Sequence, residues 1–172
     1  MKAILALGSN ESDPRRLVQR AVTAIASDIG HIAAISSEYL TRPWGFASHN
    51  DFVNIALTID TELSAIGLLD ATQEIERRLG RIHKSIDGKY SDRPIDIDII
   101  DYEGMVTDTP RLTLPHPMIQ SRNFVLYPLA EICPHWIHPV TRQAIAQLLI
   151  TTTDRDKPNK YPDSKPYFSD KK

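Results

Sequence analysis

The chain has 172 residues, a length at which a single domain buries roughly two thirds of the surface of its unfolded chain. Hydrophobic residues make up 41% and charged residues 24%, a composition typical of folded globular proteins rather than disordered ones. Twenty basic and twenty-two acidic residues give a net charge of −2, which argues against binding to long nucleic acids or anionic membranes. The single cysteine excludes an intrachain disulfide and a multi-thiolate zinc site.

The ends of the chain bear on its location and organisation. No apolar run approaches the roughly 20 residues that a membrane helix needs, and no small-residue cleavage site follows the first residues, so we expect a cytoplasmic protein without a membrane partner. Residues 1–153 predict a single domain. Residues 154–172 hold six basic and four acidic groups, three prolines and no aliphatic side chain, which predicts an extended or disordered tail without a role of its own.

The first part of the chain predicts a strand, a helix and a second strand. Residues 3–7 are a continuous apolar run, as in a strand buried on both faces. Asp13 followed by Pro14 is typical of a helix start, and apolar residues then recur at helical spacing until Gly30. Residues 32–41 are a weaker strand candidate.

The next part predicts a strand, a helix and a strand. Residues 52–60 alternate in a pattern that points one apolar set to each face of a sheet. Ser64 can cap a helix that runs to Gly80. Residues 95–100 form the sharpest strand pattern, and a last short helix is expected at residues 144–149.

This order of elements predicts an α+β fold, a ferredoxin-like βαββαβ sandwich with an antiparallel sheet, two helices on one face and additional C-terminal elements. The helices cover the face that carries the aliphatic side chains. The opposite face of the sheet then carries Phe52, Asn54, Asp96 and Asp98.

Two carboxylates on that face are unusual for a strand. Asp96 and Asp98 stand two residues apart and therefore point the same way, about 6–7 Å from each other. Carboxylates this close repel each other unless a cation lies between them. Oxygen ligands suit Mg²⁺, with substrate phosphates completing its coordination. The alternative is an ordinary strand with one solvated face.

Basic and imidazole side chains surround this pair in the sequence. Six basic residues lie within seventeen positions, at Arg77, Arg78, Arg81, Lys84, Lys89 and Arg93. Arginine binds phosphate through two parallel hydrogen bonds and lysine as a mobile point charge, so the segment suits phosphoryl-type transfer; the alternative is a solvated helix end and loop. His116, held between two prolines, can bind phosphate, although a lone histidine more often has a structural role.

A third group of residues suits a flat heterocycle. Trp44 and Phe52 can stack on a ring, and the amide of Asn54 can read its polar edge; the alternative is aromatic packing within a loop. The sequence has no phosphate-binding P-loop and no glycine-rich kinase loop, so any bound ATP is held by another framework.

Six segments together resemble the 6-hydroxymethyl-7,8-dihydropterin pyrophosphokinase family of folate biosynthesis. They are residues 7–10, 39–45, 51–54, 73–81, 92–98 and 111–128, in the family's order. The combination of DRPIDID at 92–98 with RLTLPH at 111–116 is highly specific. The resemblance implies transfer of diphosphate from ATP to the hydroxymethyl group of the pterin, giving AMP, with two Mg²⁺ ions bound. It also implies small-molecule substrates, no nucleic-acid partner and a monomer.

The resemblance further implies roles for individual residues. Asp96 and Asp98 match two metal-binding aspartates, and Arg81 and Arg93 are the expected catalytic arginines. The ATP-side positions are Gln73, Glu76, Arg81, Lys84, Arg93, Ile99, Arg111, Thr113, His116 and Arg122. The pterin-side positions are Thr41, Arg42, Pro43, Trp44, Phe52, Asn54, Tyr90, Asp96 and Phe124. The stretch between Arg81 and Arg93 matches a mobile catalytic loop that closes over both substrates.

Four positions depart from the family's pattern: Arg42 replaces a frequent proline, His83 an arginine, Tyr90 a tryptophan and Pro117 an aromatic residue. These departures affect fine substrate contacts rather than the class of reaction. Two other functions stay open from the residues alone. One is an RNA-binding sheet, although the two aspartates would repel phosphate there; the other is metal-dependent hydrolysis of a phosphate ester by the same carboxylates.

Overall fold

The computed structural model describes residues 1–81 and 91–169. The predicted site residues Lys84 and Tyr90, and the departure at His83, lie outside these ranges. Along the chain the elements are β1 (Lys2–Ser9), α1 (Pro14–Asp28), β2 (Gly30–Ile35), β3 (Tyr39–Thr41), β4 (Phe52–Thr61), α2 (Ala65–Arg78), β5 (Asp96–Tyr102), β6 (Thr107–Asp108), β7 (Thr113–Leu114), the 3-10 turn η1 (Ile119–Ser121), α3 (Asn123–Ile132), α4 (Ile145–Thr151), β8 (Asn159–Lys160) and β9 (Tyr167–Phe168).

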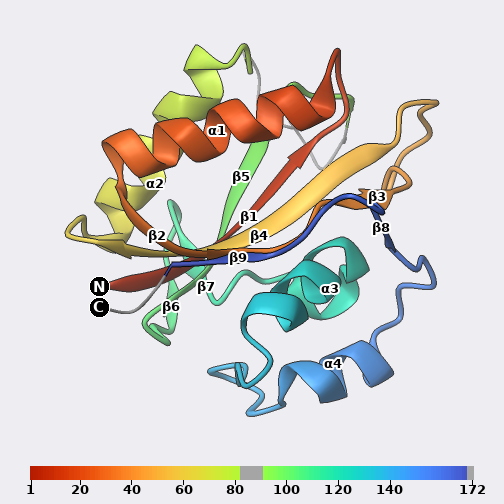
Figure 1. Ribbon diagram of the computed structural model, residues 1–172. Helices are drawn as coiled ribbons and strands as arrows, with labels where there is room; N and C mark the ends of the chain where they lie inside the picture. Colours follow the sequence, from red (N-terminus) through yellow and green to blue (C-terminus); the bar gives the residue numbers. More distant parts are fainter. Residues whose placement is uncertain (82–90, 170–172) are drawn as a thin grey trace.

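The main sheet confirms the ferredoxin-like prediction. Its strands follow the order β5-β1-β4-β2-β9, and the pairs β5–β1, β1–β4 and β4–β2 are all antiparallel. Helices α1 and α2 lie on one face of this sheet, and α3 and α4 lie on the other (Figure 1). None of the helices in the described ranges is long and apolar enough to cross a membrane.

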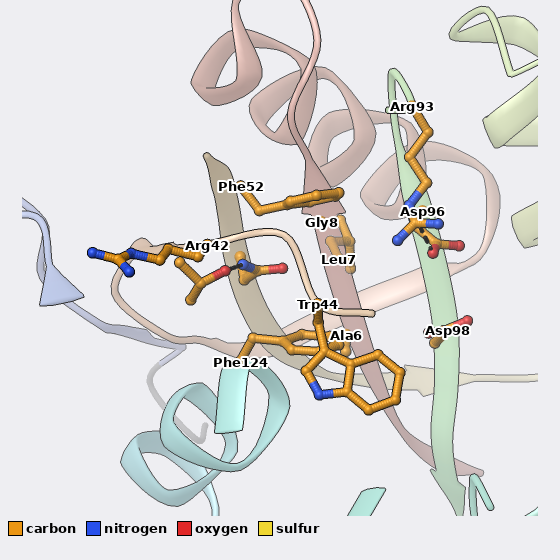
Figure 2. A pocket seen from close by; sticks show the side chains of 12 residues that line it. Ala6, Leu7, Gly8, Arg42, Trp44, Phe52, Arg93, Asp96, Asp98 and Phe124 are labelled. Carbon is orange, nitrogen blue, oxygen red and sulfur yellow. Dashed lines mark hydrogen bonds and ion pairs between the residues drawn. The ribbon is translucent and has the colours of Figure 1, made fainter. Parts of the chain in front are cut away.

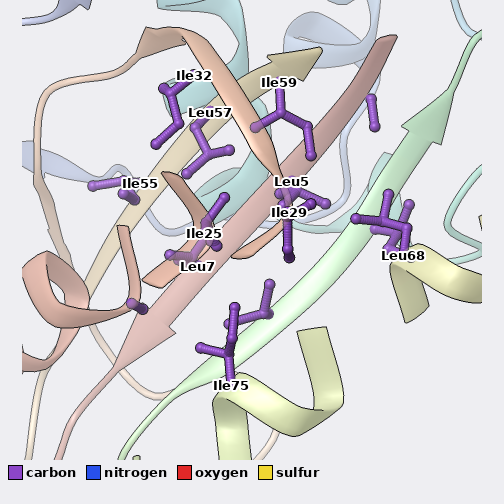
Figure 3. Close-up of a cluster of buried hydrophobic side chains, with 14 of the residues drawn as sticks. Leu5, Leu7, Ile25, Ile29, Ile32, Ile55, Leu57, Ile59, Leu68 and Ile75 are labelled. Carbon is purple, nitrogen blue, oxygen red and sulfur yellow. The ribbon is translucent and has the colours of Figure 1, made fainter. Parts of the chain in front are cut away.

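The protein has an apolar core on each face of the sheet, and strand β1 contributes to both because its side chains alternate between the two faces. Leu5 and Leu7 pack into the core under α1 and α2 (Figure 3). Ile4 and Ala6 pack into the second core, against α3 and α4. The run that was expected to be buried on both faces is therefore buried by a different pair of helices on each side.

The predicted helix boundaries are confirmed by their caps. The Asp13 carboxylate accepts a hydrogen bond from the Arg16 N–H at 3.2 Å, and the Ser64 hydroxyl accepts one from the Gly67 N–H at 3.1 Å. Each bond satisfies one of the free N–H groups of a first helical turn. Helix α2 ends before Gly80, whose φ of +103° suits glycine.

Helix α3 was not predicted, because Pro128 lies inside it. An interior proline costs a helix about 3 kcal/mol. Val125, Leu126 and Leu129 are at most 1% exposed in the second core, and each contributes roughly 1.5–3 kcal/mol on burial. Tertiary packing therefore outweighs the local penalty and keeps this segment helical.

The C-terminal tail runs along the sheet as far as it is described. Strand β8 pairs with β3, and β9 pairs with β2 at the edge of the sheet. The Tyr161 N–H donates to the Glu38 carbonyl at 3.0 Å, and the Ser169 N–H donates to the Ala33 carbonyl at 2.8 Å. Residues 154–169 thus form main-chain hydrogen bonds to the folded body, a structure that their composition did not indicate.

Candidate active site

Strand register places the key polar residues in rows across three strands. Gly8 of β1 lies opposite Asn54 of β4 on one side and opposite Asp96 of β5 on the other. Ala6 lies opposite Asp98 in the same way. Opposed residues of an antiparallel pair point to the same face, so the amide and both carboxylates share the face that the sequence predicted. Since Gly8 and Ala6 carry little or no side chain, they leave a hollow between the amide and the carboxylates.

Residues from several predicted groups line this hollow. Phe52 lies on one side of it, and Trp44 and Phe124 lie on the other (Figure 2). The predicted site residues that line it are Thr41, Arg42, Trp44, Phe52, Asn54, Arg93, Asp96, Asp98 and Phe124.

The amide of Asn54 has a fixed orientation at the floor of the hollow. Asn54 is 4% exposed, and its Nδ2 donates a hydrogen bond to Thr41 Oγ1 at 2.7 Å. Its Oδ1 lies on the side of Gly8, where a Cβ built on the glycine would come within 2.7 Å of it. The close approach of strand and amide therefore requires glycine at position 8, a role that the sequence reasoning did not assign.

Asp96 lies in a network of basic groups. It forms ion pairs with Arg81 and with Arg93, whose Nε lies 3.3 Å from Asp96 Oδ2. Arg81 also pairs with Glu76 at 2.6 Å, and Glu76 Oε1 accepts a hydrogen bond from the Ile97 N–H at 2.7 Å. Burial alone would raise the pKa of Asp96, but Arg81 and Arg93 outweigh it and lower that pKa below its ordinary value.

Asp98 has weaker compensation. Arg122 Nη1 lies 3.5 Å and His116 Nε2 lies 3.8 Å from Asp98 Oδ2. Burial, reinforced by the neighbouring charge of Asp96, raises the pKa of Asp98 to about 7. Burial and then Arg122 lower the pKa of His116 to about 4, so its imidazole is neutral at neutral pH and adds no positive charge.

The carboxylate pair suits a magnesium ion, because the positive charge around Asp98 is weaker than that around Asp96. Asp98 is a carboxylate that its protein surroundings do not fully stabilise, and a cation beside it would supply the missing charge. The described ranges contain no group of three or more acidic, histidine or cysteine side chains placed to hold a metal. Two carboxylates would therefore hold Mg²⁺ with most coordination positions left to phosphate oxygens and water, as Mg²⁺ commonly has.

A hydrogen-bonded cluster beside the hollow was missed from the sequence. Asn10 Oδ1 accepts a hydrogen bond from the Arg93 N–H at 2.9 Å, and its Nδ2 donates to Asp92 Oδ1 at 2.7 Å. Asn50 Nδ2 donates to Asp92 Oδ2 at 2.9 Å. Hydrogen bonds from Ser48, Asn10 and Asn50 lower the pKa of Asp92. The cluster ties the backbone of Arg93 to the end of β1; Asn10 and Asp92 lie in two of the matching segments, 7–10 and 92–98, but the sequence assigned neither a role.

Several predicted ATP-side residues lie outside the hollow. Arg111 pairs with Asp70 at the surface, and Thr113 donates to Asp108 Oδ1 at 2.8 Å. Gln73 lies on α2 and is partly exposed. The Ile99 side chain is 5% exposed and packs in the first core, so a ligand could contact only its backbone. Their roles toward ATP stay predictions.

Comparison with known proteins supports one family. The family model for 7,8-dihydro-6-hydroxymethylpterin-pyrophosphokinase matches residues 4–134. A relative from Porphyromonas gingivalis, named 2-amino-4-hydroxy-6-hydroxymethyldihydropteridine pyrophosphokinase, is 42% identical over 136 residues, covering 78% of this chain and 92% of its own. A relative of the same name from Methylorubrum extorquens is 41% identical over 150 residues, covering 86% of this chain and 93% of its own.

Solved structures share the fold. A crystal structure of an HPPK-DHPS in complex with substrates aligns with a TM-score of 0.68 at 14% identity, and Plasmodium falciparum HPPK-DHPS with pteroate aligns with 0.68 at 15%. Each covers 86% of this chain, which spans 42% and 41% of those longer chains respectively. At this identity the structures support the fold, while the sequence matches establish the relationship. The chain belongs to the 7,8-dihydro-6-hydroxymethylpterin-pyrophosphokinase family.

Proposed function

We propose that this chain transfers the terminal diphosphate of ATP to the hydroxymethyl group of 6-hydroxymethyl-7,8-dihydropterin, giving the pterin diphosphate and AMP. This makes it an ATP-dependent pyrophosphokinase of folate biosynthesis. One observation supports the assignment beyond family membership: Asn54, Gly8 and Asp96 lie in one row, so the Asn54 amide and the carboxylate pair line one hollow.

The pterin occupies the part of the hollow between Phe52 on one side and Trp44 with Phe124 on the other. A flat ring system stacks favourably on aromatic faces. Asn54 hydrogen-bonds the polar edge of the ring, because Thr41 holds its amide in one orientation. The ring is thereby oriented with its hydroxymethyl group toward β5, the strand that carries the two aspartates. Arg42, Pro43 and Tyr90 are the remaining residues proposed on the pterin side.

Asp96 and Asp98 hold Mg²⁺ in this proposal, two ions when ATP is bound. When bound, the metal supplies neutralisation of phosphate charge and activation of the attacking hydroxyl group. The protein contributes two rigidly placed carboxylates on one strand, with Asp98 in particular short of positive charge in its surroundings. The stronger basic surroundings of Asp96 keep that carboxylate ionised.

Arg81 and Arg93 stabilise the negative charge on the transferring group. Both contact Asp96, so their guanidinium groups are held beside the proposed metal site before ATP binds, and preorganised charge of this kind is a main source of stabilisation in phosphoryl transfer. No described residue stands out as a general base for the pterin hydroxyl, so orientation by the aromatic walls and Asn54 carries much of the catalysis.

The ATP-binding region is proposed to extend from the carboxylate pair along α2 and along the segment after β5. Glu76 holds Arg81 and the backbone of Ile97, and Arg122 with His116 borders Asp98. A neutral His116 can donate one N–H to a phosphate oxygen. The other proposed contacts are Gln73, Lys84, Ile99, Arg111 and Thr113. A single catalytic domain at residues 1–153, a monomer and a cytoplasmic location remain predictions that sedimentation and cell fractionation can test.

Product analysis tests the proposed function. Purified protein is incubated with ATP, Mg²⁺ and 6-hydroxymethyl-7,8-dihydropterin, and nucleotides and pterins are separated by chromatography. We expect AMP and the pterin diphosphate in equal amounts, with no AMP when the pterin is omitted. Release of ADP or phosphate without a pterin product would instead identify a hydrolase. Asp60→Ala, which removes an exposed carboxylate at the far end of β4, is the matched control and should retain full turnover.

A further inference from the structure

The tail after Thr153 packs against the two segments that carry the aromatic wall of the hollow. Asp156 Oδ2 accepts a hydrogen bond from the backbone N–H of Arg42 at 3.3 Å, and Asp154 Oδ2 accepts one from the backbone N–H of Asn123 at 2.8 Å. These tail residues lie beyond the part of the chain that the family model matches, which ends at residue 134. Their contacts therefore involve a segment outside the matched family domain.

The contact of Asp154 fixes the start of helix α3. The residue before this helix, Arg122, makes no side-chain capping bond. A carboxylate at a helix N-terminus satisfies a free N–H and interacts favourably with the helix dipole, and Asp154 takes that place from the tail. Phe124 is the second residue of this helix, so the tail carboxylate fixes the turn that carries an aromatic wall of the hollow.

The side chain of Asn123 strengthens the same junction. It is 4% exposed, and its Nδ2 donates to the backbone carbonyl groups of Asp154 at 3.1 Å and Asp156 at 2.7 Å. Asn123 separates Arg122 from Phe124 in the sequence. The tail is thereby bound to the helix by its main chain as well as by the Asp154 carboxylate.

The contact of Asp156 fixes the other half of the wall. Arg42 precedes Pro43 and Trp44, and the Trp44 ring packs on the Phe124 ring with centroids 6.4 Å apart at 59°. A crevice behind this ring pair is lined by residues 42–45, Phe124 and residues 154–156. The tail thus forms the back of the aromatic wall, on the opposite side from the hollow.

The tail has the pattern of a segment built for this contact. Its side chains alternate: Thr152, Asp154 and Asp156 are half-buried, whereas Arg155 and Lys157 are exposed. The Asp156 N–H donates to Asp154 Oδ1 at 3.0 Å, which holds the two carboxylates in a fixed relation. Farther along, the backbone N–H of Glu38 donates to Ser164 Oγ at 2.7 Å and anchors the rest of the tail.

We propose that Asp154 and Asp156 are positioning residues of the pterin-binding wall. They touch no substrate; they fix the backbones of Asn123 and Arg42 and so set the positions of Phe124 and Trp44, which together form the wall on which the pterin stacks. The inference rests on the proposed function, in which this wall stacks on the pterin. It gives residues 154–156 a role in substrate binding, in place of the solvated tail that their composition predicts.

Steady-state kinetics of the full-length Asp156→Ala variant test the proposal. The pterin KM should rise about two- to tenfold, the equivalent of one hydrogen bond, while the ATP KM stays unchanged. Asp156→Asn should recover the wild-type pterin KM, because an amide Oδ1 also accepts from the Arg42 N–H. Asp163→Ala is the matched control: it removes an exposed tail carboxylate whose partner is Arg15, at 3.4 Å, and should leave the pterin KM unchanged.

A second measurement probes the packing of Trp44 in the aromatic wall and does not depend on turnover. In a Trp136→Phe background, Trp44 is the remaining tryptophan, and acrylamide should quench its fluorescence more strongly in Asp156→Ala than in the parent. An unchanged pterin KM in Asp156→Ala, an equal rise in the ATP KM, or an equal effect of Asp163→Ala would each overturn the proposal. Phe124→Ala separates it from the proposed function: if that variant leaves the pterin KM unchanged, the assignment of the pterin wall itself is wrong.

Discussion

The Gly8→Ala substitution tests whether the floor of the hollow depends on the absence of a side chain at position 8. The Cβ of Gly8→Ala would lie 2.7 Å from Asn54 Oδ1, and the next nearest atom, Phe52 Cδ1, would lie at an ordinary 3.6 Å. Asn54 has little room to retreat, because it is buried and its amide donates to Thr41 at 2.7 Å. Overpacking of this kind costs about 1–3 kcal/mol.

Two assays measure the effect. Chemical denaturation should show a free energy of unfolding lower by about 1–3 kcal/mol. The pterin KM should rise by about tenfold, equivalent to roughly 1.4 kcal/mol, since the displaced amide no longer meets the ring edge, while the ATP KM should change little. The backbone at Gly8 does not have a positive φ, so alanine meets no conformational penalty and the clash is the only expected source of destabilisation.

A double-mutant cycle isolates the cause. In an Asn54→Ala background the clash is absent, and Gly8→Ala should be neutral or stabilising by about 0.4–1 kcal/mol through the restricted unfolded chain. The coupling energy between the two positions should therefore reach at least about 1 kcal/mol. Equal destabilisation by Gly8→Ala in both backgrounds would refute the reasoning, because the clash with Asn54 could not be its source.

Three further outcomes are expected. Folding raises the pKa of Asp98 to about 7, so its contribution to stability is lost as pH rises from about 4 through 7. In urea denaturation of the metal-free protein, Asp98→Asn should therefore be as stable as wild type near pH 4 and more stable at pH 8. Equal stability of the two proteins at pH 8 would contradict this. Glu76→Ala leaves Arg81 and the Ile97 N–H without a shared buried acceptor and should cost about 3–5 kcal/mol, whereas Glu76→Gln, which keeps one oxygen, should cost clearly less. Burial and Asp101 raise the pKa of the Cys133 thiol to about 11, so iodoacetamide at pH 8 should label it about a hundredfold more slowly in the folded protein than in denaturant, and equal rates would show an exposed thiolate.

The parts predicted correctly from the sequence are those governed by local pattern. Period-two alternation identified β4 and β5 and the face that carries Asn54, Asp96 and Asp98. Capping residues located both helices of the ferredoxin-like unit. The same patterns predicted that Phe52 and Asn54 share a face of the sheet with Asp96 and Asp98, and the strand pairing confirms this.

The parts that were missed depend on contacts between distant segments. Helix α3 forms despite Pro128 because its neighbours bury against the sheet. Strands β8 and β9 form because the edges of β3 and β2 offer them main-chain partners, which no local composition can reveal. The contacts of Asn10 with Asp92 and Arg93 span more than 80 residues, so spacing alone could not indicate them.

The most direct test of the central claim is turnover of Asp96→Asn and Asp98→Asn with saturating ATP, Mg²⁺ and hydroxymethyldihydropterin. Circular dichroism and thermal unfolding would confirm that each variant is folded, and Asp60→Ala would serve as the control. If the carboxylate pair is the centre of diphosphate transfer, each substitution lowers kcat by at least about a hundredfold, the scale on which removal of a preorganised charge contact reduces catalysis. Turnover within a few-fold of wild type in either folded variant would contradict the account.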